Sequence, residues 1–301
     1  MKGPDGYTSP IKLTGLMATP EEQWHHLRSF LDLNEADLDA MVQSVETLLR
    51  HSTEFVVGAY DHLLHFQETA EILGWEQGAD PEHLAERRRF FSVWLARTLG
   101  LDLSDDFARY LFKAGKYHAG HGPRRIHVPE IYVAGAISLA QASFASFMAA
   151  EMTDAALVTR ALAGWNKFLT MHLHLMTVGY RAARALDEGD YDVTVSLYGR
   201  LRHMTQTDRV TVRLPTGARS EHVLRKFFDY FPETRAEVFD VDWQDGYRLD
   251  DQGTPWLTVD RVYYPRHNWN IRLNGRNLEY AGGLAAQVHP GDEVSIFPPG
   301  R

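Results

Sequence analysis

The chain has 301 residues, 44% of them hydrophobic, which is enough for two folding units that each bury a core. A net charge of −9 without a long basic run argues against nucleic-acid binding. We expect no signal sequence because residues 1–7 contain no apolar core, and no membrane span because no uninterrupted apolar run reaches about 18 residues. The absence of cysteine excludes disulfide bonds, thiolate haem ligation and thiol catalysis, and agrees with the cytoplasm, the predicted location.

Residues 20–186 have the apolar periodicity of helices. Residues that favour helix N-termini occur at Asn34, at Asp80 followed by Pro81, and at Ser104. We expect helices at about 34–48, 55–64, 81–95, 105–118, 129–151 and 153–187. Small alanine side chains recur in the segment 129–151, which favours close packing between helices.

From residue 191 onward the apolar period changes to two, as in strands. We expect an amphipathic helix at 221–230 and strands at 193–197, 210–214, 257–264, 269–273 and 293–297. The acidic stretch 188–191 is predicted to be a linker. The chain is therefore predicted to be multidomain, with an all-α domain over 1–187 and a small α+β domain over 192–301.

His118 is the residue whose position is most informative about chemistry. It follows Phe107, Leu111 and Ala114 on one helix face, and the helix ends at once because the run Gly120–Pro123 breaks it. A neutral imidazole on a rigid helix end beside an apolar wall can ligate a haem iron. The alternative is a core histidine that is bonded to a backbone carbonyl.

Other histidines have other interpretations. His121 lies one turn after His118 and is the alternative iron ligand, or it lines the edge of a haem. His172 and His174 lie on opposite sides of a helix, which makes chelation of one metal difficult, so we interpret them as structural. His62 and His65 are spaced for one metal, but we expect both on an exposed face.

The first 185 residues or so resemble the protoglobins and the globin domains of globin-coupled sensors. Asp105–His118 resembles the segment that carries their proximal haem ligand, and Ile126–Gly135 resembles the loop and helix start that follow it. Val56–Leu64 is similar to the second globin helix with its distal tyrosine, and Arg89–Leu95 to the distal helix with an aromatic residue over the haem. Pro4–Tyr7 is similar to the N-terminal extension of protoglobins.

This resemblance implies a globin-like fold with a b-type haem (iron protoporphyrin IX). It implies that His118 is the proximal iron ligand, that Tyr60 donates a hydrogen bond to bound ligand, and that Phe91 is a distal steric wall. Further haem contacts are expected from Phe90, Trp94, Tyr117 and His121, with Arg124 and Arg125 as partners of the haem propionates. Tyr60, Phe91 and Trp94 are also explained by core packing, and the two arginines by a solvated turn. Ala59 departs from the tryptophan that protoglobins can have there, which leaves their distal packing in doubt.

The C-terminal domain resembles the MoaD/ThiS family of ubiquitin-like β-grasp sulfur carriers in the segments 193–202, 274–277 and 291–301. Members of this family end in Gly-Gly, whose carboxylate is adenylated and converted to a thiocarboxylate. This chain ends in Gly300–Arg301, and a terminal arginine would obstruct a narrow enzyme channel. We therefore expect a docking or regulatory module with a protein partner, in preference to an active sulfur carrier.

The predicted function is reversible binding of O₂, NO or CO by a sensor or gas-handling globin that is coupled to a β-grasp interaction module. The alternatives are a sulfur carrier in cofactor biosynthesis gated by the globin, a haem-dependent enzyme that processes NO or peroxide, and a structural globin without haem. No catalytic pair stands out, so an enzymatic activity is left open. We expect a homodimer through the last two globin helices, 129–151 and 153–187.

Overall fold

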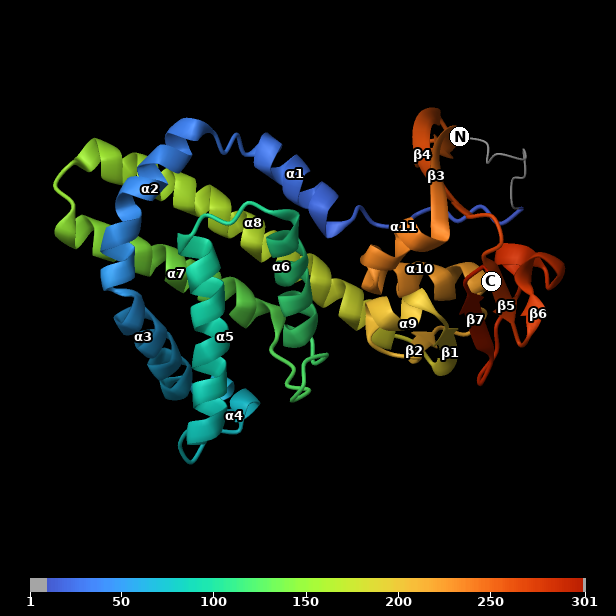
Figure 1. Ribbon diagram of the computed structural model, residues 1–301, viewed down its shortest axis with the longest axis horizontal. Helices are drawn as coiled ribbons and strands as arrows, with labels where there is room; N and C mark the ends of the chain where they lie inside the picture. Colours follow the sequence, from blue (N-terminus) through green and yellow to red (C-terminus); the bar gives the residue numbers. More distant parts are fainter. Residues whose placement is uncertain (1–9, 300–301) are drawn as a thin grey trace. The chain divides into compact units, whose positions relative to one another are not determined.

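The computed structural model describes residues 10–299, which form two compact units. One unit contains residues 20–181, and the other combines residues 10–19 with residues 182–299 (Figure 1). This division differs from the predicted boundaries, because residues 10–19 pack with the second unit and that unit resumes at residue 182. The segments Pro4–Tyr7 and Gly300–Arg301, on which two sequence arguments depend, lie outside the described residues.

The regular structure of the first unit is helical. Its helices are α1 (Pro20–Phe30), α2 (Glu35–Arg50), α3 (Ser52–His65), α4 (Gln67–Leu73), α5 (Pro81–Leu99), α6 (Asp105–His118), α7 (Glu130–Glu151) and α8 (Ala155–Asp187), whose residues from 182 onward belong to the second unit. The predicted caps are confirmed, since the side chains of Asn34, Asp80 and Ser104 accept hydrogen bonds from the backbone N–H groups of α2, α5 and α6. Sequence analysis did not resolve α1 and α4 as separate helices, because short helices show few periods.

Buried aromatic side chains fill the centre of this unit. Trp24, Phe107, Phe144, Trp165 and Phe168 are each at most 2% exposed and belong to one continuous core. Burial of each contributes roughly 1.5–3 kcal/mol of hydrophobic stabilisation. Because Phe107 lies in the first turn of α6, the core anchors the helix that carries His118.

Two glycines bring the backbones of α6 and α8 into direct contact. A Cβ atom at Gly115 would lie 1.9 Å from the backbone oxygen of Met176, and one at Gly179 would lie 1.9 Å from the backbone oxygen of Phe112. Any other residue at these positions would push the two helices apart. Gly115 lies one turn before His118, so this close crossing of the helices fixes where the end of α6 lies along α8.

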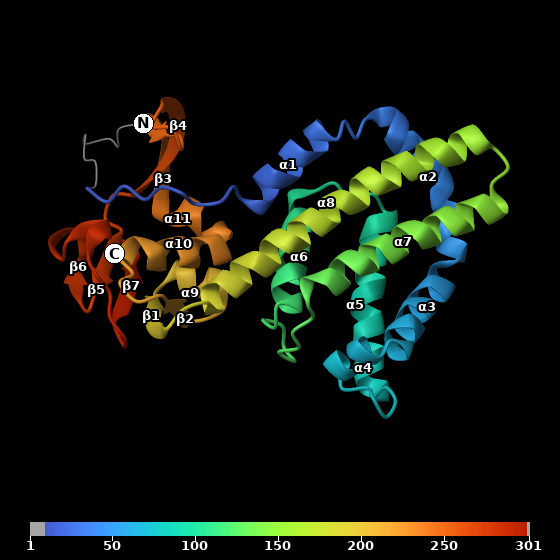
Figure 2. The same cartoon turned by 180° about the vertical axis from the view of Figure 1, so that it is seen from behind.

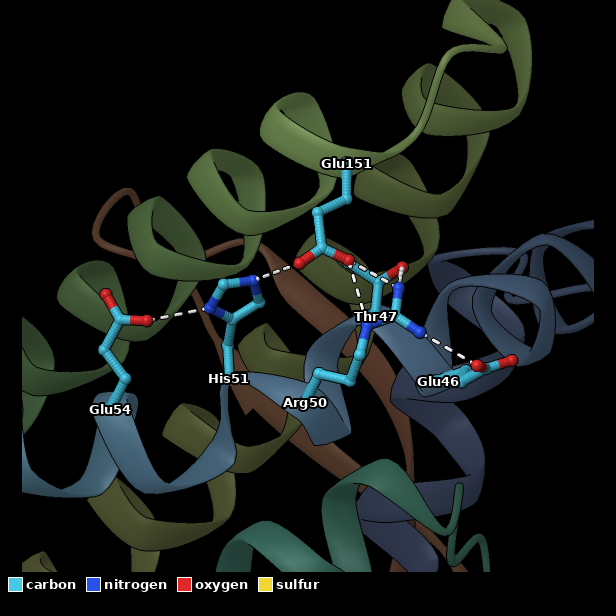
Figure 3. A network of polar contacts seen from close by, with 6 residues as sticks. All are labelled: Glu46, Thr47, Arg50, His51, Glu54 and Glu151. Atoms are coloured by element: carbon cyan, nitrogen blue, oxygen red, sulfur yellow. Dashed lines mark hydrogen bonds and ion pairs between the residues drawn. The ribbon is translucent and has the colours of Figure 1, made fainter.

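A polar network joins the α2–α3 corner to the end of α7 (Figure 3). The ring of His51 lies between two carboxylates, with Nδ1 2.8 Å from Glu54 Oε2 and Nε2 2.7 Å from Glu151 Oε1. Arg50 also binds Glu151, so one carboxylate receives two cationic partners. These bonds raise the pKa of His51 and lower that of Glu151, and His51 also stacks on Phe147.

Helix α7 leaves much of its apolar surface uncovered. It runs beside α8 in the opposite direction (Figures 1 and 2), and Ile131 is 73% exposed. By length and composition α7 alone among the described residues could cross a membrane. The sequence does not predict this, because no uninterrupted apolar run is as long as a membrane span. A helix from a protein core or an interface meets the same criterion.

The second unit is built around a mixed five-stranded sheet. Its elements are β1 (Tyr191–Leu197), α9 (Arg200–Thr205), β2 (Arg209–Leu214), α10 (Ser220–Tyr230), α11 (Arg235–Val238), β3 (Phe239–Leu249), β4 (Pro255–Pro265), β5 (Asn270–Leu273), β6 (Arg276–Asn277) and β7 (Glu293–Phe297). The strand order is β2-β1-β7-β5-β6, with β1 and β7 parallel and the other pairs antiparallel. A hairpin, a helix and a last strand parallel to the first make the predicted β-grasp topology. The helix α10 buries Phe227 and Phe228 in the core of this unit.

A long hairpin, β3–β4, forms a separate two-stranded sheet between α11 and β5. Its register pairs Val241 with Tyr263, Trp243 with Arg261 and Tyr247 with Leu257, so these side chains share one face. Trp243 is 58% and Tyr247 76% exposed. The strand β4 was predicted and β3 was not, although Phe239 to Leu249 alternates, because Asp245 interrupts the apolar positions.

The N-terminal segment explains why residues 10–19 belong to the second unit. Leu13 forms a bridge with Tyr263 through two backbone hydrogen bonds of 3.0 and 2.8 Å. Ile11 and Leu13 are buried in the core of this unit, and the backbone N–H of Met17 donates to Asp229 Oδ1 at 3.0 Å. The segment is therefore held to β4 by one isolated bridge and by its buried side chains.

Candidate haem-binding site

His118 ends α6 and is held there by its own helix. Its Nδ1 lies 2.8 Å from the backbone oxygen of Ala114, and because a carbonyl only accepts, Nδ1 carries the proton. The lone pair of the neutral ring is then on Nε2, for which no residue in 10–299 provides a partner. Val128 N–H donates to the backbone oxygen of His118 at 2.7 Å, which fixes the loop after the helix end.

The surroundings keep His118 neutral. Burial lowers the pKa of its imidazole, the hydrogen bond to Ala114 opposes this shift, and the positive charge of Arg87 adds to it. A neutral imidazole with one nitrogen protonated and fixed is the form that binds iron through the other nitrogen.

Tyr60 lies in α3 with its ring buried and 8% exposed. The ring contacts Phe91 edge-on, with 5.9 Å between the ring centroids, and lies 6.3 Å from the ring of Trp75. Burial raises the pKa of the phenol, so the hydroxyl stays protonated and can donate a hydrogen bond. Within residues 10–299 the hydroxyl has no hydrogen-bond partner, which leaves it able to donate to a small bound molecule.

Phe91 and Trp94 belong to the same aromatic group as Tyr60. Their rings stack with 5.2 Å between centroids, and Phe91 also contacts Phe55 at 5.3 Å. The Nε1 atom of Trp94 is buried and has no hydrogen-bond partner among the described residues. The structure therefore brings together these three predicted residues, one from α3 and two from α5. Their positions are consistent with a steric wall at a ligand site and equally with ordinary core packing.

Arg87 lies beside the aromatic group of Tyr60 and is not among the predicted site residues. Its Nε lies 3.0 Å from His83 Nε2, and His83 contacts Trp75, whose ring lies beside that of Tyr60. Its positive charge lowers the pKa of both Tyr60 and His118. It precedes Phe91 by four residues in α5, which places the two on one helix face. That spacing is the signal in the sequence, but the three consecutive arginines that begin at Arg87 suggest a solvated surface.

Other predicted residues lie elsewhere. Phe90 is 42% exposed beneath the side chain of Arg89, because adjacent helix residues point about 100° apart. Tyr117 is 36% exposed and lies near Lys113. Neither ring joins the aromatic group of Tyr60.

The loop after α6 carries three more of the predicted residues. His121 is half-buried, and its backbone N–H donates to the oxygen of Lys116 at 3.1 Å. Arg124 Nε donates to Glu86 Oε2 at 2.6 Å, so a carboxylate of the protein already engages it. Arg125 is exposed and has a positive φ of 52°.

The remaining histidines do not form a metal site. His172 is fully buried and neither ring nitrogen has a hydrogen-bond partner, while His174 Nε2 lies 2.7 Å from Gln23 Oε1. His62 and His65 are exposed, as expected. No group of three His, Cys, Asp or Glu side chains within residues 10–299 could hold a metal ion.

A cleft of about 360 Å³ opens on α3 and α5 and is lined by Val56, Arg88 and Leu95 among others. It does not include His118. The side-chain atom that fits a haem iron is His118 Nε2, and Tyr60 lies in the same helical unit. A neutral imidazole on a helix end is the kind of ligand by which globins hold a haem iron.

Comparison with known families agrees with this class. A family model described as Protoglobin matches residues 20–185, which is more than half of the chain, so the chain belongs to the protoglobin family. A search of curated proteins found no match.

Solved structures match parts of the chain. The globin domain of the Geobacter sulfurreducens globin-coupled sensor is 18% identical with a TM-score of 0.45, and the match covers 52% of this chain and 97% of that one. The small archaeal modifier protein 1 of H. volcanii is 18% identical with a TM-score of 0.25, covering 37% and 100%. A putative molybdopterin converting factor subunit 1 from Pyrococcus furiosus is 23% identical with a TM-score of 0.25, covering 37% and 100%. The family assignment depends on the family model, and the fold of the second unit on its own strand order.

Proposed function

We propose that this protein is a haem globin that binds a diatomic gas, O₂, NO or CO, reversibly at a b-type haem. The observation that carries the proposal is the fixed tautomer of His118, whose Nδ1–H is bonded to Ala114 and whose Nε2 remains available. Membership of the protoglobin family supports a haem-binding role. Bound haem would supply the iron that coordinates the gas.

The residues of the chain would have separate roles at this site. His118 would hold the iron from one side through Nε2. Tyr60 would donate a hydrogen bond to a ligand that gains partial negative charge, such as O₂, because its buried hydroxyl has no competing partner within residues 10–299. Phe91 would limit the size of the ligand through its position against Tyr60.

The experiment is an absorption spectrum of the purified protein in ferric, ferrous and CO-bound forms, after expression with ample haem. We expect a sharp Soret band that His118→Ala abolishes and that the control variant His121→Ala retains. A colourless wild-type protein would refute the proposal. A band that depends on His121 and not on His118 would reverse the ligand assignment.

We further propose that the protein forms a homodimer through α7 and α8. The exposed apolar surface of α7, with Ile131 73% and Leu139 44% exposed, supports a covered face. Sedimentation velocity at high micromolar concentration tests this, and a monomer that Ile131→Glu leaves unchanged would contradict it.

We propose that the second unit is an interaction module whose partner responds to the state of the haem, with sulfur transfer as the alternative. The β-grasp topology supports a module of this kind but does not choose between the two activities. Mass spectrometry of the C-terminus of the purified protein distinguishes the two activities, because sulfur transfer requires a thiocarboxylate or an adduct there. Exchange of backbone amides in residues 191–299 with and without CO tests the coupling.

A further inference from the structure

The side chains of Trp75, His83 and Arg87 form a chain of contacts with too many donors. Trp75 Nε1 lies 3.1 Å from His83 Nδ1, and Arg87 Nε lies 3.0 Å from His83 Nε2. Both outer groups are N–H donors with no acceptor function. His83 is only 5% exposed, so water is not available to relieve the conflict freely.

A neutral imidazole accepts at one nitrogen only, because the other carries a proton. Burial and the positive charges of Arg87 and Arg124 lower the pKa of His83, which favours this neutral form. Trp75 is 2% exposed and its indole N–H has His83 as its only partner within residues 10–299. The donor that is left without an acceptor is therefore that of Arg87.

The rest of the Arg87 guanidinium is also unpaired within the described residues. Its contact with His83 is its only hydrogen bond there, and it has no ion pair with a carboxylate. The nearest acidic neighbour, Glu86, is already bound by Arg124 at 2.6 Å. Arginine keeps its charge when it is buried, so the site holds a half-buried cation that lacks an anion.

We propose that Arg87 binds a planar oxyanion beside the aromatic group of Tyr60, to which its contact with His83, and that of His83 with Trp75, connect it. This inference rests on the proposed function, because the expected source of the anion is a carboxylate of the porphyrin. An oxyanion bound to the iron, such as nitrite, has the same chemistry. The fork of a guanidinium matches two oxygens of either group. When Arg87 binds the anion, it would give up its contact with His83, and Trp75 would remain the one donor to that imidazole.

The test compares Arg87→Met with Arg89→Met, whose arginine lies next to it in sequence and is exposed beside Phe90. Fluorescence titration measures binding of metal-free protoporphyrin IX and of its dimethyl ester, which lacks free carboxylates. We expect wild type and Arg89→Met to prefer the free acid by about tenfold, and Arg87→Met to lose this preference. Arg87→Lys keeps the charge without the fork and should retain part of it, which provides a second variant if Arg87→Met folds poorly.

Nitrite titration of the ferric holoprotein distinguishes the second source of the anion. If Arg87→Met weakens nitrite binding about tenfold and leaves the preference for the free acid intact, the anion is the one on the iron. If Arg87→Met equals wild type in both titrations, Arg87 is not an anion-binding residue although haem is bound. If wild type binds neither porphyrin, the haem proposal itself fails, and the inference about Arg87 fails with it.

Discussion

At the scale of single residues, the helical unit contains two histidines that are kept neutral by burial for different purposes. His118 has one nitrogen bonded and one available, which suits a ligand. His172 has neither nitrogen bonded and lies among Trp24, Phe107 and Phe168, with ring centroids 6.0, 5.0 and 4.3 Å away. Burial lowers the pKa of His172 to about 3, so it acts as an aromatic core residue.

This burial predicts a specific sensitivity to acid. The folded-state pKa of His172 lies below its unfolded value, so below about pH 6.5 the unfolded chain binds a proton that the folded chain does not. Stability should therefore fall by up to about 1.4 kcal/mol per pH unit as the pH decreases from 6.5 toward 4. Denaturant unfolding of wild type and His172→Phe at several pH values measures it. The variant should lose this component of the slope, and equal slopes would contradict the prediction.

At the scale of elements, the position of His118 depends on the close crossing of α6 and α8. We expect Gly115→Ala to destabilise the first unit by at least about 1–3 kcal/mol, because its Cβ has no room beside the backbone of Met176. It should also lower haem affinity by displacing His118.

Gly58→Ala is the matched control for this prediction. Gly58 lies within α3 and a Cβ there meets nothing within 4 Å, so alanine should stabilise the helix by roughly 0.5–1 kcal/mol. Chemical denaturation monitored by tryptophan fluorescence compares the two variants. Equal effects would show that the crossing is looser than the structure indicates.

The His51 network predicts a pH dependence of opposite sign. Hydrogen bonds to Glu54 and Glu151 raise the folded-state pKa of His51, so its contribution to stability is complete below the unfolded value and disappears as the pH rises through the folded one. The stability difference between wild type and His51→Gln should thus be larger at pH 6 than at pH 8.5. Glu151→Gln should reduce the same pH dependence, and a gap that is constant with pH would argue against the network shown in Figure 3.

At the scale of the whole molecule, the chain crosses between its two units twice. Residues 10–19 belong to the second unit, the chain then forms the helical unit, and it returns at residue 182. The second unit is therefore discontinuous in sequence, and its core includes side chains separated by more than 200 positions, such as Leu13 and Tyr263.

This connectivity predicts that a change near the N-terminus destabilises the C-terminal unit. Leu13 is fully buried there, so Leu13→Ala should cost about 2–5 kcal/mol in the unfolding of the second unit. The neighbouring Lys12→Ala, at an exposed position, should have little effect. Amide exchange in β4, measured by mass spectrometry, follows that unit, and protection that is unchanged in Leu13→Ala would contradict the assignment.

The local patterns in the sequence predict the helices with strong caps and most strands of the sheet correctly, and they single out His118 as the candidate iron ligand, which stays a prediction. These features depend on periodicity, capping and spacing within about a dozen residues, which a sequence displays directly. Phe90 and Tyr117 are predicted haem contacts, and both are partly exposed neighbours of other predicted site residues, Phe91 and His118. The sequence alone does not fix helix rotation closely enough to separate such neighbours.

Tertiary structure decided the features that depend on contacts between distant segments. The Arg87 cation lacks an anion because Glu86 is taken by Arg124 from the loop after α6, a pairing 38 positions apart. The α6–α8 crossing depends on two glycines that are 64 positions apart (115 and 179), and the membership of residues 10–19 on a bridge to residue 263. Sequence periodicity reports which side of an element is apolar, whereas only the packed chain determines which polar group is left without a partner.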